Sequence, residues 1–423
     1  MSEPSFTLPP GYTLLPEGRP AASRAWILWT CLAHIGLLVP QVTGLLHWSS
    51  KQGKLPFPPI LYVSFFMVLN LLLLLPRRPV FSITGLVIAG LGVLRLIDVA
   101  CQRFGSPDNF ASTATRLSLT LGFVILSLLI CSAALRTSAI PACAAAVASI
   151  LVSVGANLAE MAGYMKNSSV PGRAAGFIPD ANDSAIAIIC MLALILTLQR
   201  HFWFGVVMIA IAFVGIFPTL SRSGFLVFTL MVLSYFGLNF REHAGKIILS
   251  AGLFMGIGVI AVAAMSMSTS ARNDTNVQER IGAIFGGDTK KMESSERMKD
   301  LSDGWEGAMQ KPLLGHGTGA GTVFWKPHNQ FVSIWIDIGI VGASLYLGVI
   351  LVLLYKTCTQ PRAALLCSLP VIAFLPFSQT LIDTAAYWLI AILAALHSSR
   401  RPIEFKLLRP QSHSPALSHG LAS

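Results

Sequence analysis

The chain has 423 residues, of which 54% are hydrophobic and only 12% are charged. A typical soluble domain carries about 25% charged residues, so this composition excludes an ordinary soluble enzyme. The formal net charge of +11 does not by itself indicate nucleic acid, because membrane proteins collect Lys and Arg in their cytoplasmic loops. We therefore expect an integral membrane protein that contacts membrane lipids and binds no nucleic acid.

Long apolar runs recur along the chain and are typical of membrane-spanning helices. The fold class is predicted to be all-α, a polytopic transmembrane bundle with one large polar loop that contains short helices. About twelve bundle helices are expected, at residues 25–46, 57–75, 80–96, 117–135, 140–164, 185–198, 202–219, 224–238, 246–265, 331–355, 363–378 and 385–397. The expected divisions are a tail (1–24), helices one to nine (25–265), the loop (266–330), helices ten to twelve (331–397) and a second tail (398–423).

The short connections between these helices predict the orientation of the bundle. If the amino terminus is cytoplasmic, every inner connection is basic, as the positive-inside rule requires. Both termini are then cytoplasmic, and the long loop faces the outside. The residues that carry this argument are Arg77, Arg78, Arg136, Arg200, Arg241, Lys246, Lys356 and Arg362.

A second set of basic residues lies at the outer ends of the helices, against the usual bias. Any one of them could simply extend to lipid headgroups. As a group they favour an anionic ligand at the outer membrane face, and a lipid-linked phosphate or diphosphate fits that position. The set consists of Arg103, Arg116, Lys166, Arg173 and Arg222.

The segment TLSRSG at residues 219–224 separates two apolar runs at this outer face. The planar guanidinium of Arg222 suits phosphate oxygens. Ser221, Ser223 and the start of the next helix supply hydroxyl and backbone N–H donors to the same anion. An ordinary helix turn held by an Arg at the headgroups explains the spacing equally well.

Residues 293–310 in the long loop are predicted to form an amphipathic helix that ends before Pro312. Arg297 lies two turns before Trp305, so both side chains are expected on nearly the same side of the helix. The other charges are predicted to form a solvated face. The apolar stripe is expected to contain Met298, Leu301, Trp305 and Ala308.

His328 and Asn329 directly precede the tenth helix. A neutral imidazole can take a proton from a sugar hydroxyl near pH 7, and Asn329 could orient that hydroxyl. A lone His at a helix start is more often a cap or an interface residue. His316 competes for the same role, although its glycine neighbours indicate a turn.

Several motifs of other enzyme classes are missing from the sequence. It has no glycine-rich nucleotide loop, no Asp-x-Asp, no HExxH and no GxSxG. Asp180 and Asp183 form the nearest acidic pair at the outer face, and hard cations usually need more carboxylates than two. We therefore expect no metal ion and no cofactor.

The polar segments, taken in order, resemble the O-antigen ligase and O-antigen polymerase superfamily, over roughly the last half of the chain. Members of that family are polytopic inner-membrane glycosyltransferases of the GT-C type, which use undecaprenyl-diphosphate-linked glycans at the periplasmic face. The segments that carry the resemblance are Ser221 with Arg222, Arg297 with Trp305, residues 311–317, His328 with Asn329, and residues 338–342.

The resemblance implies a role for individual residues. Arg222 and Arg297 would hold the diphosphate, and Arg280 would be a further basic position. His328 would be the catalytic base, and Asp383 would match an acidic position near the site.

The resemblance also implies an activity, which is glycan transfer from undecaprenyl diphosphate to a sugar hydroxyl of lipid A–core. Transfer would be metal-independent and would invert the anomeric carbon. An O-antigen polymerase, with a second lipid-linked glycan as acceptor, is the alternative within the family. A transporter or lipid flippase is the alternative from another class, although such proteins usually bury ionisable residues near the bilayer midplane and show paired repeats.

Overall fold

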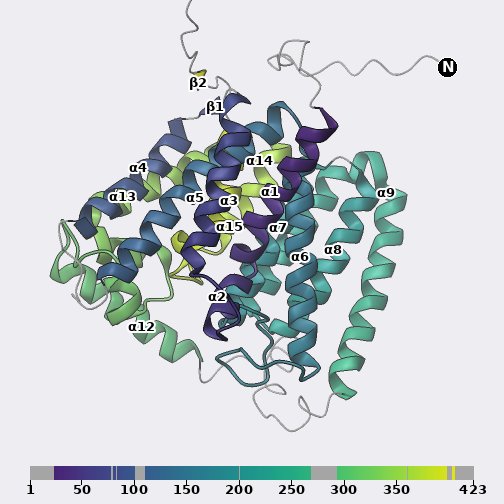
Figure 1. The fold of residues 1–423 in the computed structure, drawn as a ribbon. Helices are drawn as coiled ribbons and strands as arrows, with labels where there is room; N and C mark the ends of the chain where they lie inside the picture. Colours follow the sequence, from purple (N-terminus) through teal and green to yellow (C-terminus); the bar gives the residue numbers. More distant parts are fainter. Residues whose placement is uncertain are drawn as a thin grey trace, which may run out of the picture.

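A computed structural model describes residues 23–77, 80–81, 83–100, 110–199, 201–267, 293–359, 361–397 and 403–404. In this part of the chain the protein is a helical bundle (Figure 1). The bundle helices are α1 (Arg24–Val42), α3 (Pro59–Leu74), α4 (Ile83–Ala100), α5 (Phe110–Arg136), α6 (Ile140–Met161), α7 (Ala181–Leu198), α8 (Phe202–Ile216), α9 (Arg222–Met267), α13 (Gln330–Thr359), α14 (Pro361–Ala373) and α15 (Ala385–His397). The predicted all-α polytopic class is confirmed.

Smaller elements connect these helices. The helices are α2 (Leu45–Lys51) and α12 (Glu293–Gln310). Short turns are η1 (Leu75–Arg77), η3 (Phe217–Thr219), η5 (Leu381–Asp383) and the π-type turn η4 (Gly321–Trp325). The strands β1 (Val80–Phe81) and β2 (Ile403–Glu404) pair in antiparallel fashion.

Seven helices in the described residues are long and apolar enough to cross a membrane. Three shorter apolar helices, which cover residues 59–74, 84–95 and 385–396, accompany them. The helices expected at residues 224–238 and 246–265 are both present, but they are joined in the single element α9. Its backbone leaves the helical conformation at His243, where φ is −137° and ψ is 27°.

The centre of the bundle is formed by α7 and α15. Residues 184–196 of α7 and 386–396 of α15 are buried without interruption. A helix that is apolar on all sides belongs in such a position, because every face of it contacts protein. Large apolar side chains on α1, α3 and α13 point outward instead, as expected for surfaces that face lipid.

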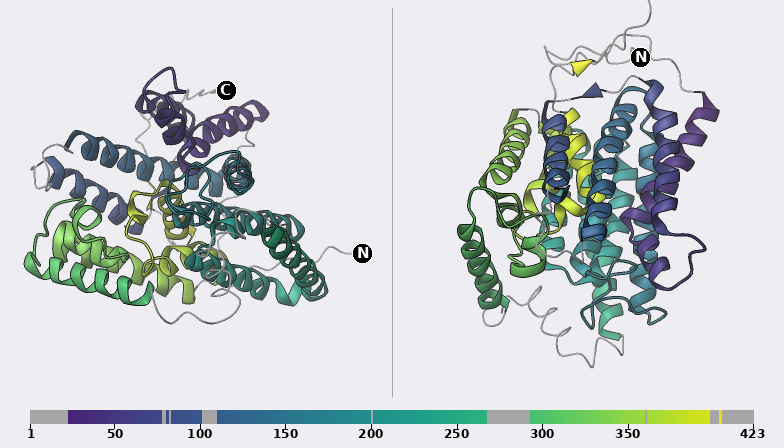
Figure 2. Two further views of the ribbon diagram at one scale, coloured as in Figure 1. Left: turned by 90° about the horizontal axis from the view of Figure 1, so that it is seen from below. Right: turned by 60° about the vertical axis from the view of Figure 1, so that its left-hand side comes forward.

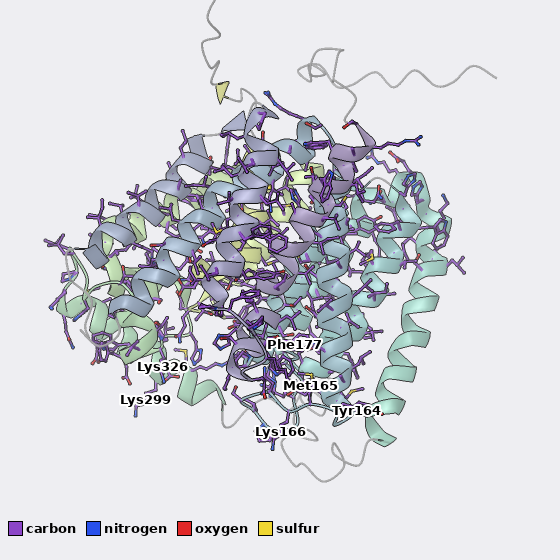
Figure 3. The ribbon with its side chains drawn as sticks, in the orientation of Figure 1. Tyr164, Met165, Lys166, Phe177, Lys299 and Lys326 are labelled. Atoms are coloured by element: carbon purple, nitrogen blue, oxygen red, sulfur yellow. The ribbon has the colours of Figure 1, made fainter. Side chains whose placement is uncertain are left out.

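The two ends of the bundle differ in what they carry. The β1–β2 pair, next to Arg77, and the start of α1 lie at one end (Figure 1). Tyr164, Lys166, Lys299 and Lys326 gather at the opposite end (Figure 3). α12 and the segment before α7 therefore share one end of the molecule, and the site described next is built there.

Candidate active site

The loop after α9 contains α12 at the residues where the sequence predicts a helix. Both views of Figure 2 show it at the edge of the bundle, and it packs against α13. Leu301 and Ala308 join a small apolar cluster there, as expected, whereas Met298 is 64% exposed and does not belong to the buried stripe. The ring of Trp305 packs edge-to-face on Trp335, with the centroids 5.0 Å apart.

Two glycines bring α12 unusually close to its neighbours. A Cβ on Gly304 would lie 2.6 Å from Cβ of Pro327, and a Cβ on Gly307 would lie 2.5 Å from Nε1 of Trp325. Glycine inside a helix costs roughly 1 kcal/mol relative to alanine. Here the close approach explains both glycines, because they seat α12 directly on the segment that leads to His328.

The glycine-rich stretch at residues 311–319, hereafter the glycine loop, docks into a break in α13. The break lies at Ile338 and Gly339, where φ is −122° and 70°. Breaking the helix frees backbone carbonyls, and His316 N–H donates to the carbonyl of Ile336 at 2.6 Å. Gly317 N–H donates to the carbonyl of Asp337 at 2.9 Å. The segments at 311–317 and 338–342, which carry the family resemblance, thus meet at one contact, hereafter the joint.

Two buried carboxylates hold the glycine loop and its continuation from different helices. Asp98 Oδ2, on α4, accepts hydrogen bonds from the backbone N–H of Thr318 at 2.6 Å and from its hydroxyl at 2.9 Å. Asp337 Oδ1, on α13, accepts from Gly321 N–H at 2.8 Å. Because one carboxylate belongs to α4 and the other to α13, these hydrogen bonds hold the loop between the two helices. Neither carboxylate was among the predicted site residues. Acidic residues inside apolar helices often have a functional role, so their position in the sequence could have identified them.

Arg95 and Asp383 form a buried ion pair beside this joint. Arg95 Nη1 lies 3.0 Å from Asp383 Oδ1, and their side chains are 6% and 12% exposed. Removing one partner of a buried pair leaves an uncompensated charge, which is strongly destabilising. Asp383 therefore has a structural partner in α4.

His316 links the glycine loop to α12. Its Nε2 lies 2.8 Å from the carbonyl oxygen of Gly307, and its ring centroid lies 4.5 Å from that of Trp325. The neighbouring Gly315 and Gly317 have φ values of 70° and 108°. The turn that the sequence indicates at His316 is confirmed.

His328 has very different surroundings. Its backbone is left-handed, with φ of 48°, and its N–H donates to Oε1 of Gln379 at 3.0 Å. The imidazole is 47% exposed, and its Nε2 lies 3.7 Å from Oδ2 of Asp300. It borders an open pocket of about 530 Å³, which is lined by Asp300, Asp303, Glu306, Gln310, Val323, Phe324, Trp325, Lys326 and His328. A proton acceptor at a pocket rim is what general base catalysis requires.

The residues after His328 anchor the start of α13. Asn329 Oδ1 accepts from the N–H groups of Phe331 at 3.0 Å and Val332 at 3.2 Å. Gln330 N–H donates to the carbonyl of Leu375 at 2.9 Å. The side chain that caps α13 is therefore that of Asn329 and not that of His328.

The turn at residues 219–222 lies at the same end of the bundle. Ser221 is 1% exposed, and its Oγ accepts from Gly224 N–H at 3.1 Å, so it caps α9. Arg222 is the first residue of that helix and is partly exposed. A Cβ on Gly224 would lie 2.8 Å from Cβ of Ala185, so the starts of α9 and α7 are in direct contact.

Of the other outer basic residues, Arg173 supports this turn. It is 8% exposed, its Nε donates to the carbonyl of Thr219 at 2.8 Å, and its Nη2 donates to Oδ1 of Asn182 at 2.8 Å. Lys166 is exposed. Arg103 and the side chain of Arg116 lie outside the described residues.

The segment at residues 378–383 connects the two parts of the site. Gln379 holds the backbone of His328, and Asp383 holds Arg95. Thr380 Oγ1 donates to Oδ1 of Asp183, in the first turn of α7, at 3.4 Å. The side chain of Asp180, the other member of the acidic pair, caps α7.

The remaining residues that were predicted to bind the diphosphate are Arg297 and Arg280. Arg297 is exposed on α12 and does not line the pocket that His328 borders. Arg280 lies outside the described residues. The structure therefore brings together His328, the 378–383 segment and the start of α7, which contacts α9 beside Arg222.

A comparison with family models matches residues 185–347 to Wzy_C, which is described as O-antigen ligase. The matched span runs from α7 into α13, so it contains the turn at Arg222, α12, the glycine loop and His328. No curated protein matches the chain. Asp98 lies outside the matched span, yet it holds Thr318 inside it. The central part of this membrane protein, residues 185–347, is thus similar to the O-antigen ligase family.

Proposed function

We propose that this protein is an O-antigen ligase, which transfers a glycan from undecaprenyl diphosphate to a sugar hydroxyl of lipid A–core. The observation that carries the proposal is the position of His328 within the family-matched span. Its imidazole is exposed at the rim of a pocket, while the residues on either side of it are fixed to the bundle.

His328 acts as the general base in this reaction. It takes the proton of the acceptor hydroxyl as the oxygen attacks the anomeric carbon. Asp300, 3.7 Å from Nε2, stabilises the imidazolium that forms. Attack from the face opposite the diphosphate inverts the anomeric carbon, and a product of unchanged configuration would contradict a single displacement.

Arg222 and Arg297 bind the diphosphate, with Arg280 as a further basic residue. Arg222 is the first residue of α9, where backbone N–H groups and the helix dipole add to its charge. These guanidiniums neutralise the charge of the departing diphosphate, so the transfer is metal-independent. Ser221 contributes by capping the same helix turn.

The proposed location is the inner membrane, with the site at the periplasmic face and both termini in the cytoplasm. The end of the bundle next to Arg77 is the cytoplasmic end in this orientation. The end that carries α12 and His328 is then periplasmic, where the lipid-linked donor and lipid A–core meet.

A polymerase would use the same base and the same diphosphate site with a lipid-linked glycan as acceptor. The polar loop of moderate size favours the ligase. A transporter or flippase is the candidate of another class, and it would not depend on His328 as a base.

Reconstitution of the purified protein with undecaprenyl-diphosphate glycan and lipid A–core, without added metal or nucleotide, tests the proposal. The expected result is a glycan ladder on lipid A–core that disappears in His328→Ala. Longer lipid-linked glycan with no transfer to the core would make the protein a polymerase. No product of either kind would favour transport.

A further inference from the structure

The pocket beside His328 has one wall made by a single face of α12. Asp300, Asp303 and Glu306 recur every three residues along it, so they share that face. The opposite wall is the segment that contains Phe324 and Lys326. Leu301 and Ala308, which pack against α13, lie on another face of the same helix. The acidic face is therefore turned to the pocket by the packing of α12.

The charges in this pocket oppose a phosphate. Its lining contains three carboxylates and one ammonium group, Lys326, which sum to −2 when His328 is neutral. Charged groups of like sign raise the free energy of a bound ligand, whereas complementary charge favours binding. A diphosphate is therefore directed away from this pocket. Arg222 and Arg297, which bind the diphosphate in the proposed function, do not line it.

The same lining suits the hydroxyl groups of a sugar. Carboxylates accept hydrogen bonds, and three of them together with the amide of Gln310 can bind several hydroxyls at once. Phe324 is 58% exposed, which gives an apolar surface for the C–H face of a sugar ring. A pocket of about 530 Å³ has room for a ligand of this size.

We propose that this pocket is the acceptor subsite, and that it selects a sugar without phosphate around its reactive hydroxyl. The inference rests on the proposed function, in which His328 is the base. The acceptor oxygen forms a bond to the anomeric carbon while its proton passes to the imidazole of His328. The bond from the anomeric carbon to the diphosphate oxygen breaks, and the diphosphate leaves with that electron pair. Donor and acceptor therefore approach His328 from opposite sides.

Binding of two soluble probes to the full-length protein in nanodiscs tests this proposal, with saturation-transfer NMR as the readout. The probes are phosphate-free lipopolysaccharide core oligosaccharide and inorganic pyrophosphate. Replacing Asp303→Asn together with Glu306→Gln is expected to weaken oligosaccharide binding about tenfold, because charge-assisted hydrogen bonds are lost. Pyrophosphate binding is expected to stay within about twofold, since its site lies elsewhere.

Lys299→Gln is the matched control, because Lys299 is exposed on the same helix and does not line the pocket. It is expected to leave oligosaccharide binding unchanged. The charge-reversed pair, Asp303→Lys with Glu306→Lys, is expected to abolish oligosaccharide binding at the pocket. Competition between pyrophosphate and the oligosaccharide would overturn the proposal. Oligosaccharide binding that is unchanged in both double variants of Asp303 and Glu306 would overturn it as well.

The ladder assay on the wild-type protein separates this inference from the proposed function. If the ladder forms but oligosaccharide binding does not depend on Asp303 and Glu306, the acceptor subsite is contradicted and the ligase reaction is supported. Binding that depends on Asp303 and Glu306, without any transfer to lipid A–core, would support a sugar subsite and contradict the ligase reaction.

Discussion

The two histidines of the long loop occupy opposite kinds of environment. His316 is held on both sides, by the carbonyl of Gly307 at 2.8 Å and by the ring of Trp325. His328 is 47% exposed, and the acidic side chain nearest to it in the described structure stands 3.7 Å away. The two residues are close in sequence and identical in chemistry, so their surroundings decide what each can do. His316 fastens the loop, and His328 is available to a ligand.

The strongest test of this comparison is His328→Ala. Loss of a general base is expected to lower the rate of glycan transfer by about 10²–10⁴-fold. The melting temperature is expected to change little, because the His328 side chain is 47% exposed and Asp300 lies 3.7 Å from its Nε2. Both quantities are measured on the reconstituted protein. Activity within tenfold of the wild type would remove His328 from the role of base.

A second test breaks the joint that holds His316. Gly339 has φ of 70°, and a Cβ there would collide with the carbonyl of Leu313. Gly339→Ala is expected to destabilise the protein by about 3 kcal/mol, from the strained backbone and the collision together. Gly348→Ala is the control on the same helix, since a Cβ there meets nothing within 4 Å. Equal melting temperatures for the two variants would show that the loop does not depend on this joint.

The third test removes the carboxylate that holds the glycine loop from α4. Asp98→Ala is expected to cost about 2–3 kcal/mol, because two hydrogen bonds from Thr318 to a buried charge are lost. Thermal unfolding in detergent measures the loss. Asp98→Asn retains one acceptor oxygen and is expected to lose less. If both variants unfold at the wild-type temperature, the loop is held by other contacts.

The smallest effect is expected for His316→Phe. The aromatic ring still packs on Trp325, and the hydrogen bond to Gly307 is lost, at a cost of about 1 kcal/mol. Transfer activity is expected to stay within a few-fold of the wild type. Turnover that vanishes while the melting temperature holds would reverse the assignment of the two histidines.

Local sequence pattern predicted the elements of this fold well. The apolar runs predicted the bundle helices, and α12 has the bounds that its periodicity and Pro312 indicate. The stripe on α12 was less accurate, because Met298 is exposed where a buried residue was expected. Periodicity reports which positions repeat on one face, but the packing of α12 against α13 decides how much of that face is covered.

The site was only partly predictable. His328 and Arg222 were proposed from residue type and position, and the structure places both at one end of the bundle. Asn329 and Ser221 were expected to contact substrate, and the structure gives their side-chain oxygens to the starts of α13 and α9. An Asn or Ser that caps a helix is the same residue type as one that binds a ligand, so the sequence could not separate the two roles.

The sequence by itself determined the membrane bundle, the helix in the loop and the motifs of the family. Only the tertiary structure decided how those motifs meet. Asp98 and Thr318 are 220 positions apart in the chain, and Arg95 and Asp383 are 288 apart. Local periodicity contains no information about such pairs, because they form only when separate helices pack. The same packing turns the acidic face of α12 towards His328 and thereby makes the pocket.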